Sequence, residues 1–258
     1  MDYGGNMIRL YVTEPELSAG RVFALDDGQS RYLTTVMRLH VNDEVAVFNG
    51  RDGEWLARIH EAGKKGVRLE AVRQLRPQSG GQGPVLVVSM VKRTALEYMV
   101  EKATELGVSA IHLVITHRSS GSNTNVERLI SIAREAAEQT ERLDIPAIIP
   151  PVKFADWLAT SNLETIIFGD EESTHEGEEK ATLPLLHSLQ KLHANASNAA
   201  ASVAVLIGPE GGFDDEERQM LHGNSKVCPV NLGPRILRAD TAAISALTLV
   251  QAVLGDWR

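Results

Sequence analysis

The 258-residue chain has little of what builds a disulfide, a metal site or a membrane anchor. Its one cysteine, Cys228, excludes an internal disulfide, and we expect it to be a small buried apolar residue. The eight histidines are scattered, and the closest pair, His112 and His117, has neither a helix-borne nor a zinc-finger spacing, so we expect no metal. No apolar run approaches the roughly 20 residues of a membrane span, and the first ten residues lack the features of a signal peptide. We therefore expect no membrane association and a cytoplasmic location.

Positive charge is also in deficit, with a formal net charge of −8. The deficit is uneven, because residues 7–76 are nearly balanced and residues 77–258 carry most of the acidic excess. Much of that excess lies in "GDEESTHEGEEK", residues 169–180, which has no apolar periodicity and predicts a solvated loop. The net charge alone therefore does not exclude nucleic acid as a partner of the front of the chain.

The length suggests one large or two modest domains. Residues 8–76 contain short alternating apolar pieces separated by turn signals such as "DDG" and "GRDG", which predict a small β-barrel or sandwich. The segment "RPQSGGQGP", residues 76–84, is rich in glycine and proline and is typical of a linker.

After this linker the pattern changes to strands alternating with helices. This alternation predicts a mostly parallel sheet with helices on its faces. The first helix is expected to start with a capping box of Thr94 and Glu97 and to end at Gly107, and the second to begin near Asn125. The expected strands are residues 85–91, 110–115, 164–168, 203–207 and 227–232.

A glycine-rich turn stands out in "VLIGPEGGFDDEE", residues 205–217. It follows an apolar run and precedes Asp214 and Glu217, which have the spacing of a capping box, so we expect a strand, a turn and a helix. No lysine follows the glycines, which argues against a triphosphate-binding P-loop, and the spacing does not match a dinucleotide fingerprint. From the turn alone, a ligand site and a tight turn without a ligand both stay open.

Four motifs occur together in order: "VEKATELGVSAIHLVITHRS" (100–119), "EAAEQTERLDIP" (135–146), "LIGPEGGF" (206–213) and "NLGPRILRADTA" (231–242). With them, the chain from Met7 onward resembles the RsmE family of 16S ribosomal RNA uracil-N3 methyltransferases, within the SPOUT superfamily. The resemblance implies an α/β fold: a PUA-like β-barrel that binds RNA over residues 1–78, and a trefoil-knotted SPOUT methyltransferase domain over residues 79–258. It also implies a homodimer that binds S-adenosyl-L-methionine and methylates N3 of a uridine in 16S ribosomal RNA of the small ribosomal subunit.

Two other functions stay open. One is a knotted methyltransferase that acts on another RNA or on ribose. The other is a non-catalytic ribosome-binding factor, although its expected mark, a lost donor pocket, is absent because both glycine turns are intact.

The resemblance also implies a set of site residues. Arg238 is expected to hold the target base or its developing charge, since a guanidinium offers fixed donors and stays protonated. Glu210 is the candidate proton acceptor, with a solvent-facing or helix-capping carboxylate as the alternative. Asp240 stands where the family commonly has glutamate, and it or Thr241 could simply cap the last helix. The expected cofactor-binding residues are Ile207, Gly208, Pro209, Glu210, Gly211, Gly212, Leu232, Gly233, Ile236, Leu237 and Arg238.

RNA contacts are expected from basic residues in both domains. Each of them could instead be a solvated or ion-paired surface residue. In the barrel, Tyr32 stands where a histidine is usual, so that histidine cannot be essential here. The candidates are Arg9, Arg38, Lys92, Lys102, Arg118 and Arg142.

Overall fold

The structure is a computed structural model that describes residues 7–170, 183–195 and 200–257. The chain forms two compact units. The first contains the chain up to residue 80 together with residues 137–145, and the second contains residues 81–136 and those from 146 onward. Most of the acidic segment at 169–180 lies outside the described residues.

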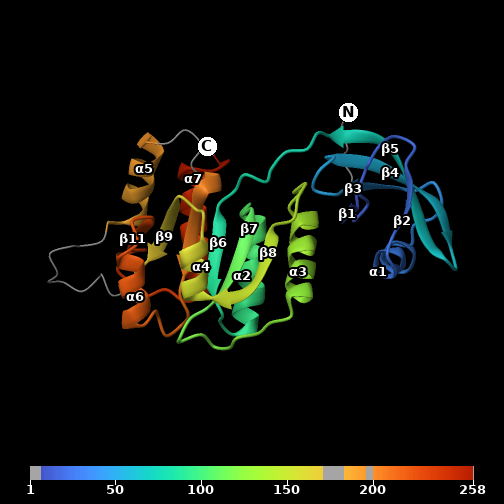
Figure 1. The fold of residues 1–258 in the computed structure, drawn as a ribbon. Helices are drawn as coiled ribbons and strands as arrows, with labels where there is room; N and C mark the ends of the chain where they lie inside the picture. The colour runs from blue at the N-terminus through green and yellow to red at the C-terminus, as the bar shows by residue number, and fades with distance from the viewer. Residues whose placement is uncertain (1–6, 171–182, 196–199, 258) are drawn as a thin grey trace. The chain divides into compact units, whose positions relative to one another are not determined.

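The first unit is a five-stranded sheet in the order β1-β3-β4-β5-β2 (Figure 1). β1 runs parallel to β3, and the other neighbours are antiparallel. Inward-facing side chains of the strands, among them Val45 and Leu69, form one core together with Leu33 of the segment after β2, and this confirms the expected small β-unit. A short helix, α1 (Asp27–Arg31), and a π-helical turn, η1 (Tyr32–Val36), follow β2. The strands are β1 (Arg9–Tyr11), β2 (Val22–Ala24), β3 (Glu44–Phe48), β4 (Glu54–Gly63) and β5 (Gly66–Arg76).

Residues 137–145 belong to the first unit because Arg9 binds their backbone. Its guanidinium pairs with Glu54 at 2.6 Å and donates hydrogen bonds to the carbonyl oxygens of residues 137, 138 and 142 at 2.9–3.2 Å. The Arg9 side chain is only 10% exposed and also lies over the ring of Phe48. Arg9 was expected to contact RNA, but these contacts occupy it inside the unit and give it a structural role.

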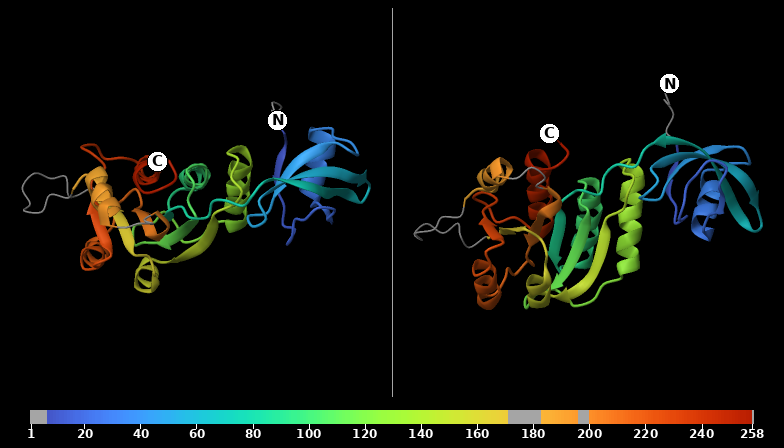
Figure 2. Two further views of the ribbon diagram at one scale, coloured as in Figure 1. Left: turned by 90° about the horizontal axis from the view of Figure 1, so that it is seen from above. Right: turned by 45° about the horizontal axis from the view of Figure 1, so that its top comes forward.

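The second unit is built on a six-stranded sheet in the order β11-β9-β10-β6-β7-β8, in which every neighbouring pair is parallel. The central strands β6 and β10 are buried along their whole length. Helices α2, α5 and α7 pack on one face, and α4 and α6 lie on the other (Figure 2, left). The expected parallel sheet between helices is confirmed. The strands are β6 (Val85–Ser89), β7 (Ala110–Ile115), β8 (Ala147–Lys153), β9 (Thr165–Gly169), β10 (Val203–Ile207) and β11 (Val227–Val230).

The helix boundaries agree with the sequence signals at most ends. α3 begins after Asn125, whose side chain accepts the N–H of Arg128, and α2 ends before Gly107, which adopts a φ of +80°. Among the helices that the structure describes, none is long and apolar enough to cross a membrane. The helices are α2 (Arg93–Glu105), α3 (Val126–Gln139), α4 (Phe154–Thr160), α5 (Leu185–Asn195), α6 (Asp215–His222) and α7 (Ala239–Val253), with a 3-10 turn η3 (Ala200–Ser202) before β10.

Two expectations about this unit are wrong, and one strand is missing from the expected set. The missing strand is β8, whose sequence "AIIPPVK" contains two prolines, which an edge strand tolerates. The capping box of Thr94 and Glu97 does not form, since the N-cap of α2 is Lys92, two residues before Thr94, and the Glu97 carboxylate binds two arginines instead. Cys228 is only partly buried because β11 is the other edge of the sheet.

Candidate functional site

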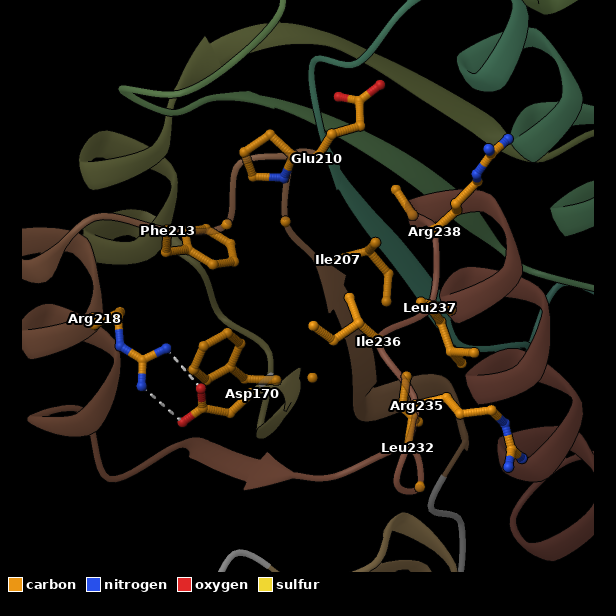
Figure 3. Close-up of a pocket in the computed structure, with 18 residues that line it drawn as sticks. Asp170, Ile207, Glu210, Phe213, Arg218, Leu232, Arg235, Ile236, Leu237 and Arg238 are labelled. Atoms are coloured by element: carbon orange, nitrogen blue, oxygen red, sulfur yellow. Dashed lines mark hydrogen bonds and ion pairs between the residues drawn. The ribbon is translucent and has the colours of Figure 1, made fainter. Parts of the chain in front are cut away.

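A cavity of about 250 Å³ opens where β9 and β10 end and the chain returns after β11 (Figure 3). Because β9 lies between β10 and β11 in the parallel sheet, the carboxyl ends of all three strands meet at this edge. This edge is where open α/β sheets bind ligands. The lining comes mainly from residues 168–170, 207–213 and 232–239.

The glycine turn after β10 forms one wall. A Cβ atom on Gly208 would lie 2.8 Å from a ring carbon of Phe213, so a side chain cannot be added there without displacing that ring. Phe213 is itself fixed, because it packs against Phe154 and Phe168 with ring centroids 5.3 and 5.4 Å apart. The absence of a side chain at Gly208 therefore keeps this wall of the cavity open.

The opposite wall is apolar and belongs to the loop that precedes α7. Leu232, Ile236 and Leu237 line it, and Gly233 supplies a turn with a φ of +104°. Ile236 is 82% exposed at this wall. A slot with aliphatic walls and glycine turns that present backbone polar groups fits a nucleoside such as the adenosine part of S-adenosylmethionine.

The expected cofactor-binding residues all line this cavity except Gly211. The carbonyl oxygen of Gly211 accepts a hydrogen bond from Arg118 Nη1 at 2.8 Å. A Cβ atom there would be 3.5 Å from the Arg118 side chain, which is an ordinary contact.

The wall of the cavity contains an ion pair that the sequence did not predict. Asp170, 3% exposed, accepts hydrogen bonds from Arg218 Nη1 at 2.7 Å and Nη2 at 3.3 Å, and His222 Nε2 lies 3.3 Å from the same carboxylate (Figure 3). Residues 169–180 were expected to form a solvated loop, and this is wrong for the first two, because Gly169 is the last residue of β9 and Asp170 is buried. The sequence signal that could have identified Asp170 is its position directly after a buried strand. Other lining residues that were missed are Phe168, Gly169, Phe213, Arg235, Ala239 and Ala242.

The candidate catalytic residues differ in position. Glu210 and Arg238 line the cavity, are exposed, and extend away from its interior at one rim in Figure 3. Asp240 does not line it; its carboxylate accepts the N–H and the hydroxyl of Thr241 at 2.6 and 3.2 Å. The helix itself begins at Ala239 with Arg238 in the N-cap position, so neither Asp240 nor Thr241 is the N-cap. The Asp240 carboxylate nevertheless satisfies one of the free N–H groups of the first turn.

The loop after β7 contacts the glycine turn and the start of α6. The N–H of His117 donates to Glu217 Oε1 at 2.9 Å, and its ring contacts Asp214, the N-cap of the expected capping box, which is confirmed. The Asp214 carboxylate raises the pKa of His117, while the backbone N–H of Glu217 and the His117 ring lower the pKa of Asp214. These three side chains place possible metal-ligand atoms within 4.8 Å of one another, but both carboxylates already accept backbone N–H groups.

The remaining RNA candidates fall into two groups. Lys102 lies 2.8 Å from Glu101 and 2.7 Å from Glu105, which raise its pKa, and Arg142 pairs with Asp144 at 3.1 Å with 11% of its side chain exposed. Lys102 is therefore ion-paired at the surface of α2, and Arg142 is engaged inside the fold. Arg38 and Lys92 are exposed and form no ion pair with any residue that the structure describes. Arg118 is exposed and hydrogen-bonded to the glycine turn.

Comparisons with known proteins agree with this architecture. Residues 83–251 match the family described as "RNA methyltransferase domain", and residues 25–72 match "RNA methyltransferase PUA domain". "Ribosomal RNA small subunit methyltransferase E" of Rickettsia conorii is 32% identical over 94% of each chain, and the protein of the same name from Bacillus subtilis is 26% identical over 93% of each.

Two solved structures show the same fold. A putative methyltransferase from Legionella pneumophila, in complex with the cofactor SAM, superposes with a TM-score of 0.77 at 28% identity and covers 96% of this chain and 98% of its own. Ribosomal RNA small subunit methyltransferase E from Neisseria gonorrhoeae, bound to S-adenosyl methionine, has a TM-score of 0.81 at 24% identity and covers 98% of this chain and 100% of its own. From its two matched domains and its nearly full-length similarity to these enzymes, the chain belongs to the RsmE family of ribosomal RNA small subunit methyltransferases.

Proposed function

We propose that this protein is an S-adenosyl-L-methionine-dependent methyltransferase that acts on N3 of a uridine in 16S ribosomal RNA. The observation that carries the proposal is the cavity between the two glycine turns, in a chain of the RsmE family. Its walls have the apolar character and the side-chain-free turns at Gly208 and Gly233 that a bound nucleoside requires. S-adenosyl-L-methionine, once bound, supplies an electrophilic methyl group.

The chain's own residues then have distinct tasks. Ile207, Leu232 and Leu237 line the cavity and would exclude water from the bound donor. Much of the rate enhancement would come from holding donor and base in line, because positioning two reactants removes a large entropic cost.

The acceptor chemistry concerns the proton on uracil N3. This proton must leave for N3 to be a good nucleophile, and Glu210, at the rim, is our candidate to accept it. Arg238, at the same rim, would bind the uracil oxygens and stabilise the anion that forms. As the new N3–C bond forms, the bond from the methyl carbon to sulfur breaks and its electron pair stays on sulfur. We assign Asp240 to the start of α7 and not to the reaction, because it lies outside the cavity lining.

The surrounding assembly is part of the same proposal. The PUA-like unit within residues 1–78 would supply RNA affinity, and residues 79–258 would supply a knotted SPOUT catalytic domain. We propose a cytoplasmic homodimer acting on the small ribosomal subunit, with Arg38, Lys92 and Arg118 as the RNA contacts that the fold leaves accessible.

The direct test is mass mapping of methylated uridines in small-subunit RNA from cells with and without this protein. We expect one N3-methyluridine to disappear when the gene is deleted and to return with the wild-type protein. Identical methylation patterns in both strains would refute the proposed function. Calorimetric titration of the purified protein with S-adenosyl-L-methionine tests the donor site independently of the RNA.

The role of Arg238 has its own test. Arg238→Lys should lower single-turnover methylation much more than donor affinity, because an ammonium lacks the planar fork that binds two acceptors. The loss should shrink at higher pH, where the N3 proton leaves without help. A structural role in which Arg238 fixes the loop before α7 predicts an equal loss at every pH together with weaker donor binding.

A further inference from the structure

A second cavity, of about 360 Å³, lies beside the start of α2 and the segment 120–125. It opens after β6 and β7, which follow β10 in the sheet order, so it lies at the same edge of the sheet as the donor cavity. No part of the proposed donor chemistry uses it. The residues that bear on its function are Lys92, Arg93, Glu97, Ser120, Asn125 and Arg128.

The lining of this cavity has an excess of positive charge in an acidic protein. The lining contains three cations, Lys92, Arg93 and Arg128, and one carboxylate, Glu97, so its side chains carry a net charge of +2. Glu97 accepts hydrogen bonds from Arg128 Nε and Nη2 at 2.6 and 3.0 Å and from Arg93 Nε at 2.7 Å. Arg128 first, and then Arg93, lower the pKa of Glu97 to about 2, so the carboxylate stays ionised at neutral pH and holds both guanidinium groups.

These cations keep donors for a ligand. Arg93 uses only its Nε in the pair with Glu97, and a guanidinium has five N–H donors. Lys92 has no ion pair with any described residue, and its side chain is exposed. Asn125 accepts the N–H of Arg128 through Oδ1, which leaves its amide NH₂ available. Arginine, lysine and asparagine donors together are the groups that contact phosphate and sugar in nucleic-acid complexes.

The two cavities share an edge. Ser120 lines the second cavity, Glu210 lines the donor cavity, and Ser120 Oγ donates to Glu210 Oε2 at 3.3 Å. Arg118, two residues before Ser120, holds the same glycine turn through the carbonyl oxygen of Gly211. A nucleic-acid strand whose backbone lies in the second cavity can therefore extend past Glu210 and place a base at the donor cavity.

We propose that the second cavity binds the phosphodiester backbone of the substrate RNA next to the target uridine, with Lys92, Arg93 and Arg128 as the phosphate contacts. This inference rests on the proposed function, because the neighbouring donor site is what selects RNA over a free anion. The backbone contacts orient the strand, and the donor cavity performs the chemistry.

The test compares a double variant, Arg93→Gln with Arg128→Gln, with the matched control Lys191→Gln. Lys191 is an exposed cation on α5 that lines neither cavity. Filter binding to unmethylated small ribosomal subunits at several salt concentrations gives affinity and salt slope, calorimetry gives donor affinity, and methylation kinetics give KM and kcat.

We expect the double variant to weaken RNA binding about tenfold. The slope of log affinity against log salt concentration should be smaller in magnitude by about one to two, because fewer counterions are released from the RNA when fewer phosphates are contacted. KM for the subunit should rise while donor affinity stays unchanged, and the control should behave like the wild type. Unchanged RNA affinity and slope in the double variant, with a wild-type enzyme that binds donor and methylates RNA, would overturn the inference alone. A wild-type protein that fails to methylate RNA would instead refute the proposed function.

Discussion

The buried pair of Asp170 and Arg218 allows a quantitative prediction about the wall of the donor cavity. Arg218→Met removes two hydrogen bonds, at 2.7 and 3.3 Å, from a carboxylate whose side chain is 1% exposed. Removing one partner of a buried ion pair costs about 3–5 kcal/mol, because a charge is left without compensation. Since Arg218 is 17% exposed and His222 stays 3.3 Å from Asp170, we expect the low end, about 3 kcal/mol.

For a unit of this size, that loss corresponds to a Tm lower by roughly 6–12 °C. Asp170→Asn added to Arg218→Met should recover part of it, because the uncompensated charge is then absent. Arg128→Met is the matched control, since it breaks an exposed pair in the same unit and should change the free energy of unfolding by about 1 kcal/mol or less. Scanning calorimetry of the four proteins measures these shifts. A single variant that melts within about 2 °C of the wild type, or a double variant less stable than the single one, would refute the reasoning.

Three further predictions concern the turn and the first unit. Gly208→Ala should weaken donor binding at least about tenfold and destabilise the protein by about 1–3 kcal/mol, because its Cβ would lie 2.8 Å from an aromatic ring, whereas Gly211→Ala should leave calorimetric affinity nearly unchanged. His117 has a raised pKa, so the stability that it contributes is complete below its unfolded pKa of about 6.5 and is lost as the pH rises through the higher folded value. We therefore expect the wild-type Tm to fall as the pH rises above 6.5 and His117→Gln to reduce this fall, and an identical pH profile in the variant would contradict this assignment. Arg9→Met should destabilise the first unit by about 2–3 kcal/mol in calorimetry, because Glu54 loses one of its two arginines, and a melt equal to the wild type would show that this contact is dispensable.

The sequence alone determined the features that depend on neighbours within a few residues. Three such features are the capping box of Asp214 and Glu217, the start of α3 at Asn125 and the buried strand before the glycine turn. The two caps are hydrogen bonds between residues three positions apart, and the strand is a continuous apolar run, so each can be recognised within one element. The four ordered motifs then led to the family. Strand β8, which contains two prolines, was not among the expected strands, and local signals do not reveal that a strand lies at the edge of a sheet, where proline is tolerated.

Tertiary structure decided which charged residues are available to a ligand. Arg9 looked like a candidate for phosphate, but Glu54 and the carbonyl oxygen of Glu138, both far away in the chain, bind its guanidinium. Arg142 has a local partner in Asp144, and the fold leaves only 11% of its side chain exposed. Asp170 looked solvated, yet the sheet order places it beside Arg218, 48 residues later. The sequence gives the charge of each side chain. Its burial and its distant partners depend on which strands become neighbours in the sheet, and no local sequence pattern contains that information.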